Sequence, residues 1–322
     1  MKRPAISYPE AVPGPTRLTA ARAVAGALVA AFALSACQVP GESVPGPGPA
    51  VRQVDSTTAP EPQDEFVYVA MGDSYTAAPL FPLAEQEQIN GCLRSDANYP
   101  ALVADQLDVA FTDVSCSGAS TTSMFAVQRF VDNERPPQLD SLQAETDLVT
   151  LGIGANDFRY FSKMIFTCLK VAKRDPQGAP CREKNLTPRG RDRIEKNLGQ
   201  IRANVARVVR EIARRAPEAR ILLIGYPQLL PAEGTCRAKL PLAVGDYEYT
   251  RDLNLRLANA VRRGGVSAGA EFVDLVEASQ GHDICSDEPW VAGIRGAPQR
   301  AMGLHPYPEE QRAVADLVVG LL

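Results

Sequence analysis

Short apolar runs separated by helical patterns constrain the fold of this chain more than any other feature. Five of them have the length of a strand, and they cover residues 66–71, 109–114, 148–153, 220–225 and 272–275. Their apolar residues are continuous rather than alternating, which is typical of strands covered on both faces, as in parallel sheets. We therefore expect a parallel sheet with helices on both sides.

Apolar residues spaced three and four positions apart predict the covering helices. The first is expected at about 190–215, and a second ends at Gly264-Gly265. The last begins near Pro308 and is expected to turn four side chains inward, Val314, Leu317, Val318 and Leu321. Alternating strands and helices predict an α/β fold, a three-layer α/β/α sandwich with a parallel, flavodoxin-like sheet.

The first 65 residues have a different composition from the rest. Basic residues precede a short apolar run at 23–36, which suits a secretory signal better than an uncleaved transmembrane anchor. The run ends Leu34-Ser35-Ala36-Cys37, which resembles the bacterial motif in which the cysteine is lipidated after cleavage. We expect a signal peptide at 1–36, a lipid at Cys37 with a Pro/Gly-rich tether through 65, and a catalytic domain at 66–322. Ordinary secretion is the alternative.

Six of the seven cysteines lie beyond Cys37, an even number that favours disulfides in an exported protein over buried free thiols. No CxxC pair occurs, and two histidines give little to build a metal site from. Removal of residues 1–36 changes the formal charge from −4 to −7. An acidic chain without a basic stripe is a poor nucleic-acid binder, and it should not be drawn electrostatically to anionic lipid surfaces. Any membrane contact is expected through the lipid on Cys37, and the protein is expected to be a monomer.

Polar, glycine-rich turns follow three of the expected strands. These are Gly72-Asp73-Ser74, Ser117-Gly118 and Gly154-Ala155-Asn156-Asp157. Ligands of open parallel sheets bind beyond the carboxyl ends of the strands, where these turns should converge. A serine, a glycine N–H and an asparagine amide at one rim would supply a nucleophile and donors for an oxyanion.

A serine nucleophile needs a base, and the chain contains only two histidines. His305 directly precedes the expected final helix, whereas His282 lies close to a cysteine expected in a disulfide. Position along the chain therefore favours His305 as the base. A purely structural role is the alternative for either histidine.

Four of these segments, in this order, resemble the conserved blocks of the SGNH/GDSL hydrolases. They are Gly72-Asp73-Ser74, Gly118, Gly154-x-Asn156-Asp157 and His305-Pro306, and the resemblance extends from about residue 66 to residue 322. It implies that the Ser74 and Gly118 N–H groups and the Asn156 side chain form an oxyanion hole. It also implies structural roles for Asp73 and Asp157.

One position departs from the family pattern. Met302 stands three residues before His305, where most members carry the aspartate of a triad. The chain is similar to the exported actinobacterial lipases and phospholipases that use a Ser–His dyad, in which a main-chain carbonyl near this position, here that of Met302, orients the histidine. A tryptophan precedes their histidine, as Trp290 does here. The alternative is a decayed enzyme that has lost its acid.

Six cysteines permit fifteen pairings, and periodicity cannot choose among them. The same resemblance implies which pairing forms. It predicts three bonds between consecutive cysteines, Cys92–Cys116, Cys168–Cys181 and Cys236–Cys285.

The sequence thus predicts an exported serine hydrolase of lipase, esterase or phospholipase type, acting on small-molecule or lipid esters without metal or cofactor. Phe161, Met164, Ile165 and Leu169 are expected to form an ordinary helix core, with an acyl pocket as the alternative. Acyl transfer at the same site and a non-catalytic envelope-binding lipoprotein remain alternative functions. The expected location is the outer face of the cytoplasmic membrane, or the medium after secretion.

Overall fold

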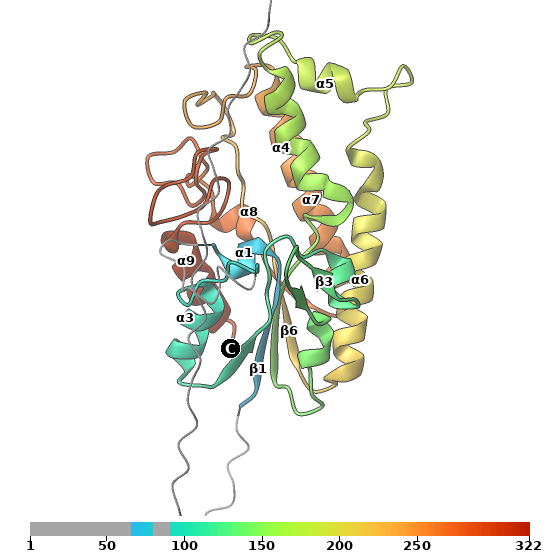
Figure 1. Cartoon of the computed structure of the whole chain (residues 1–322), viewed down its shortest axis with the longest axis vertical. Helices are drawn as coiled ribbons and strands as arrows, with labels where there is room; N and C mark the ends of the chain where they lie inside the picture. The colour runs from blue at the N-terminus through green and yellow to red at the C-terminus, as the bar shows by residue number, and fades with distance from the viewer. Residues whose placement is uncertain (1–65, 80–90) are drawn as a thin grey trace, which may run out of the picture. The chain divides into compact units, whose positions relative to one another are not determined.

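Five parallel strands form the central sheet of the described chain, in the order β2-β1-β5-β6-β7 (Figure 1). The computed structural model describes residues 66–79 and 91–322, so the expectations for residues 1–65, Cys37 included, lie outside the described residues. The strands are β1 (Tyr68–Gly72), β2 (Phe111–Asp113), β5 (Leu148–Gly152), β6 (Arg220–Ile224) and β7 (Glu271–Val273). This is the flavodoxin-like order, and it confirms the predicted sheet.

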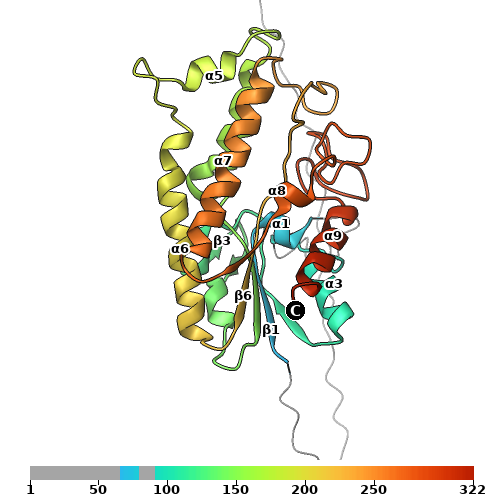
Figure 2. The ribbon, with the colours of Figure 1, turned by 180° about the vertical axis from the view of Figure 1, so that it is seen from behind.

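Helices cover both faces of this sheet, which confirms the three-layer sandwich. Figures 1 and 2 show α3 and α9 on one side and α6 and α7 on the other. The helices are α1 (Ser74–Ala77), α3 (Tyr99–Leu107), α4 (Tyr160–Val171), α5 (Pro180–Asn185), α6 (Leu198–Arg215), α7 (Asp246–Val266), α8 (Leu275–Ala278) and α9 (Pro308–Val319). A short hairpin of β3 (Gln128–Arg129) and β4 (Glu134–Arg135) and four 3-10 turns, Thr121–Met124, Gln138–Ser141, Asp157–Arg159 and Glu195–Asn197, complete the described elements.

The register of the two central strands positions the functional rim. Tyr68 lies opposite Leu148, and Gly72 lies opposite Gly152, so β1 and β5 end level with one another. All five residues of each strand are buried, as their continuous apolar sequences predict. The turns after these strands therefore emerge side by side at the same edge.

Two expected helix boundaries differ from the structure by unequal amounts. The helix expected from about residue 190 begins at Leu198, after the bridge between Leu186 and Asp192 and a 3-10 turn at Glu195–Asn197. The second helix ends at Val266, one residue beyond the expected Gly264-Gly265. A Cβ at Gly264 would lie 2.6 Å from the Arg202 carbonyl, and one at Gly265 would lie 2.2 Å from a Leu223 methyl. These glycines therefore serve close packing against α6 and β6 rather than helix termination.

Not all of the side chains expected to turn inward from α9, the last helix, are buried. Val314 and Val318 are buried in α9, but Leu317 is 38% exposed and Leu321 is 42% exposed. Leu317 lies beside the buried stripe, and Leu321 lies beyond the last helical residue.

The three disulfides of the structure pair consecutive cysteines, as the resemblance implied: Cys92–Cys116, Cys168–Cys181 and Cys236–Cys285. Within residues 66–79 and 91–322, no helix has the length and apolar character needed to cross a membrane.

Candidate active site

A pocket of about 340 Å³ opens at the carboxyl edge of the sheet and brings the four sequence blocks together. Ser74, Gly118, Asn156 and His305 all line it, although they come from four separate segments. The remaining lining residues are Asp73, Tyr75, Leu93, Ser117, Ala155, Phe161, Ser162, Phe166, Met302, Gly303 and Leu304.

Ser74 is the first residue of α1, directly after the end of β1. The Asp73 carboxylate caps this turn by accepting a hydrogen bond from the Tyr75 N–H at 2.9 Å. The Ser74 N–H donates to no acceptor among the described residues, and its hydroxyl likewise has no hydrogen-bond partner there. Both groups are thus available to a molecule in the pocket.

The Tyr226 side chain hydrogen-bonds to two of the sequence blocks, at Asp73 and at Ala155. Its hydroxyl donates to Asp73 Oδ2 at 2.6 Å and accepts from the Ala155 N–H at 3.1 Å. Burial raises the pKa of Asp73 to about 7, and the hydrogen bonds from Tyr226 and Tyr75 oppose that rise. Tyr226 was not predicted as a site residue, although it follows β6 at the same rim as the predicted turns.

Gly118 lies in the loop after β2 with a positive φ of 77°, a conformation that strains residues with a side chain. The loop is held in place by the Cys92–Cys116 disulfide and by two backbone bonds, Cys116 N–H to Gly72 O and Ser117 N–H to Cys92 O, both at 3.0 Å. No described residue accepts the Gly118 N–H. A second main-chain donor is therefore free at the pocket.

Asn156 and Asp157 follow β5. The Asn156 amide donates one hydrogen bond to the Ala119 carbonyl at 2.9 Å, which fixes the side chain beside the glycine loop. The Asp157 carboxylate accepts from both the N–H and the hydroxyl of Thr121, at 2.8 and 2.7 Å. Asp157 thus holds the segment after the loop, in agreement with its expected structural role.

His305 is oriented by a different carbonyl from the one expected. Its Nδ1 lies 2.8 Å from the Gly303 carbonyl oxygen. The Met302 carbonyl instead accepts from the main-chain N–H of His305, at 3.1 Å, because the chain turns tightly between them. Burial lowers the pKa of His305, while the bond to Gly303 opposes that shift. The imidazole is thus held neutral to lower pH than an exposed histidine.

Tyr75 connects the serine turn to the histidine loop. Its hydroxyl donates to the Leu304 carbonyl at 3.0 Å, and its own carbonyl accepts from the Gln311 amide at 3.1 Å. Sequence reasoning missed this residue, because its partners lie more than 220 positions away along the chain.

His282 lies outside the lining of this pocket. Its ring stacks on Trp290, with 4.9 Å between centroids, and its Nδ1 lies 2.7 Å from the Glu288 carbonyl. These contacts give His282 a structural setting apart from Ser74.

One helix supplies the apolar wall. Phe161 and Phe166 of α4 line the pocket, whereas Met164 and Ile165 are fully buried in the core. The two alternatives for this helix, a core role and a pocket role, therefore apply to different residues: Met164 and Ile165 lie in the core, and Phe161 lines the pocket. Phe166, which sequence reasoning did not single out, is 50% exposed at the pocket.

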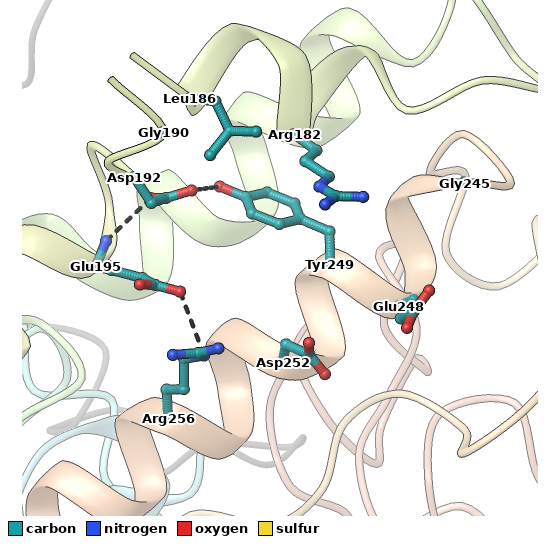
Figure 3. A pocket seen from close by; sticks show the side chains of 10 residues that line it. All are labelled: Arg182, Leu186, Gly190, Asp192, Glu195, Gly245, Glu248, Tyr249, Asp252 and Arg256. Atoms are coloured by element: carbon teal, nitrogen blue, oxygen red, sulfur yellow. Dashed lines mark hydrogen bonds and ion pairs between the residues drawn. The ribbon is translucent and has the colours of Figure 1, made fainter. Parts of the chain in front are cut away.

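A second pocket of about 320 Å³ lies between α5, the 186–195 segment and α7 (Figure 3). Some of its charged groups bind other lining residues. Asp192 accepts from the Tyr249 hydroxyl at 2.5 Å and from the Ile194 N–H at 2.6 Å, and Arg256 pairs with Glu195 at 3.2 Å.

Across the described part of the chain, no group of three or more His, Cys, Asp or Glu side chains is placed to hold a metal ion.

The model of the GDSL-like Lipase/Acylhydrolase family matches residues 70–313 of this chain. Lipase 2 of Streptomyces coelicolor is 37% identical over 265 residues, a match that covers 79% of this chain and 85% of that protein. A lipase of Streptomyces rimosus is 30% identical over 232 residues, covering 70% of this chain and 76% of the relative.

Two solved structures share the fold. The extracellular lipase from Streptomyces rimosus has a TM-score of 0.62 and 26% identity, covering 80% of this chain and all of its own (100%). Phospholipase A1 from Streptomyces albidoflavus has a TM-score of 0.66 and 24% identity, covering 80% of this chain and 99% of its own.

Proposed function

The chain belongs to the GDSL-like lipase/acylhydrolase family and is a carboxylic ester hydrolase, and on this premise we propose that it works through an acyl-enzyme at Ser74. The observation that carries the proposal is the convergence of Ser74, His305 and two unpaired main-chain N–H groups on one pocket.

The proposed reaction begins when the Ser74 hydroxyl transfers its proton to His305 Nε2 and its oxygen attacks the ester carbonyl carbon. The carbonyl oxygen becomes an oxyanion that the Ser74 N–H, the Gly118 N–H and the second amide N–H of Asn156 stabilise. Protonated His305 then gives the proton to the leaving alcohol oxygen as the C–O bond breaks. Water, deprotonated by His305, hydrolyses the acyl-enzyme and returns Ser74 to its starting form.

His305 needs no carboxylate partner in this scheme. The Gly303 carbonyl 2.8 Å from Nδ1 fixes the tautomer that leaves the Nε2 lone pair free to accept the serine proton. A dyad oriented by the main chain is therefore consistent with methionine at position 302.

A fluorophosphonate probe tests the nucleophile directly, because it phosphonylates an activated serine. We expect one probe per molecule on Ser74 by mass spectrometry and no labelling of Ser74→Ala. Ser162→Ala is the matched control, since Ser162 lines the same pocket and should leave labelling intact. Labelling of Ser74→Ala at another serine would contradict the mechanism.

Export and lipid anchoring form the second part of the proposal. Three disulfides suit a protein that folds outside the cytoplasm, and a structural relative is an extracellular lipase. We propose that the chain is cleaved before Cys37 and held by lipid at this residue, as a monomer. In the native host the wild type should partition with membranes, whereas Cys37→Ser should be released or left unprocessed. Wild-type protein found in the medium with an unmodified N-terminus would contradict the anchor.

A further inference from the structure

One outward side of α4 combines lysines with an exposed aromatic ring beside the catalytic pocket. Lys163, Phe166 and Lys170 are separated by three and four residues, a spacing that places them on the same side of a helix. Lys173 follows three residues after Lys170, just beyond the end of α4. We call these four residues the α4 face.

This face is locally basic in an acidic chain. Residues 158–174 contain five cations and no carboxylate, although the whole chain has a formal charge of −4. Lys170 and Lys173 are exposed and Lys163 is half-buried. Within the part of the chain that the structure describes, none of the three forms an ion pair. Their charges are therefore available to an outside partner.

The opposite side of the helix is fixed to the domain. Met164, Ile165 and Cys168 are fully buried, and the Cys168–Cys181 disulfide joins α4 to α5. α4 lies in front of α7 in Figure 1, and α4 packs on α7 through residues outside the α4 face: the Tyr160 hydroxyl donates to the Leu253 carbonyl, and the Thr250 hydroxyl donates to Cys168 Sγ. The α4 face therefore belongs to a helix that the core, the disulfide and α7 hold in place.

Phe166 links the face to the chemistry. Its ring lines the pocket that holds Ser74 and is half exposed to solvent. A flanking ring of this kind suits the boundary between lipid headgroups and acyl chains, whereas a soluble polyanion needs no apolar contact. Lysines near an anionic membrane surface are attracted to it even when the net charge of the protein is negative, since the attraction decays within about 10 Å.

We propose that the α4 face docks the enzyme on an anionic lipid surface and places lipid esters at the mouth of the Ser74 pocket. Docking would bring the scissile ester of a surface lipid close to the nucleophile without the lipid leaving the bilayer. This revises the expectation from net charge that the chain is not drawn to such surfaces. The role in delivering substrate rests on the proposed function of Ser74, but docking itself does not.

The test measures binding to vesicles of phosphatidylcholine with and without phosphatidylglycerol, by co-sedimentation of the full chain. Every variant carries Ser74→Ala, so that no lipid is hydrolysed, and Cys37→Ser, so that no acyl chain at this position contributes. The triple variant Lys163→Gln/Lys170→Gln/Lys173→Gln is compared with Arg210→Gln/Arg262→Gln/Arg263→Gln. The control removes the same charge from exposed positions on α6 and α7.

We expect the lysine triple variant to bind phosphatidylglycerol vesicles up to about 100-fold more weakly at low salt, since each lysine contributes about fivefold. The arginine control should bind nearly as the wild type does, and added salt should weaken wild-type binding. Phe166→Gln should weaken binding to vesicles but not to soluble polyphosphate. With Ser74 restored, both triple variants should cleave a soluble short-chain ester at the wild-type rate, which separates docking from catalysis.

Equal binding by the two triple variants would overturn the proposal. So would binding of polyphosphate as tight as that of vesicles and equally dependent on the three lysines, because the face would then recognise a soluble polyanion. Absence of soluble-ester turnover by the protein that carries Ser74 and all three lysines would instead contradict the proposed mechanism and leave the docking result unaffected. Loss of that turnover in the lysine triple variant alone would overturn the proposal, because the lysines would then act in catalysis.

Discussion

Two pockets of nearly equal volume differ in the kind of polar group that they leave unpaired. The Ser74 pocket, of about 340 Å³, is lined by a serine hydroxyl and two main-chain N–H groups that no described residue pairs. The pocket of Figure 3, of about 320 Å³, contains more charged side chains. Asp192 bonds Tyr249 and Glu195 pairs with Arg256, whereas Arg182 and Glu248 line the pocket without an ion pair among the described residues. Volume, charge and unpaired side chains therefore do not identify the candidate active site. The unpaired hydroxyl and main-chain N–H groups that converge on the Ser74 pocket set it apart.

Removal of the proposed base, His305, should cause the largest loss of activity. We expect His305→Ala to lower kcat/KM for a soluble ester by about 10⁴-fold or more, because the serine proton then has no acceptor. The matched variant is His282→Ala, whose ring stacks on Trp290 outside the pocket and which should stay near the wild-type rate. An active His305→Ala and an inactive His282→Ala would reverse the assignment of the base.

Removal of one proposed oxyanion donor, Asn156, should cause a smaller loss of activity. Asn156→Ala is expected to lower kcat by about 10²–10³-fold with little change in the thermal unfolding midpoint. Asn204→Ala is a suitable control, since Asn204 hydrogen-bonds to Asp157 behind the rim but does not line the pocket. Comparable losses of kcat in the two variants would mean that Asn156 acts through the fold rather than on the oxyanion.

The pH profile should report the buried imidazole. Protonated His305 cannot accept the serine proton, so kcat/KM should fall as the pH drops through its pKa. Because burial lowers this pKa, the midpoint of the acid limb should lie below the ordinary histidine value of 6.5. His282→Ala should show the same limb. A midpoint above 6.5 would mean that the imidazolium is stabilised in the site, against the burial seen here.

The smallest effect on catalysis is expected in the second pocket. Tyr249→Phe removes the hydrogen bond to Asp192 and should lower the free energy of unfolding by about 1 kcal/mol, measured in urea. Ester turnover should be unchanged, because Tyr249 does not line the Ser74 pocket. A loss of turnover without a loss of stability would show that the two pockets communicate.

The sequence predicted the sheet well because its central strands β1 and β5 are fully buried and so appear as continuous apolar runs. The edge strands β2 and β7 are more exposed than that pattern implies. It predicted the boundaries of helices less exactly. Glycine often follows the last helical residue, but α7 runs through Gly264-Gly265 and ends one residue later, at Val266. In the structure the space against Arg202 and Leu223 decides these positions, and such a contact leaves no local pattern.

The residues of the candidate site likewise fall into those that the sequence could predict and those that it could not. Ser74, Gly118 and Asn156 could be placed at this pocket because each lies in the turn after a strand, within a segment that resembles a family motif. Tyr226 could not, because its bonds to Asp73 and Ala155 join residues 153 and 71 positions apart. The choice between the Met302 and Gly303 carbonyls depends on one tight turn, which composition does not reveal.

The Gly303 carbonyl gives the histidine a partner that no side-chain substitution can delete and no ordinary pH can protonate. Its position can still be lost, because a Cβ at residue 303 would lie 2.4 Å from the Ile294 carbonyl oxygen. The orientation of the proposed base therefore depends on a residue that has no functional group of its own. A search for a missing catalytic acid would pass over Gly303, whereas a mutational scan should find it as intolerant as many reactive side chains.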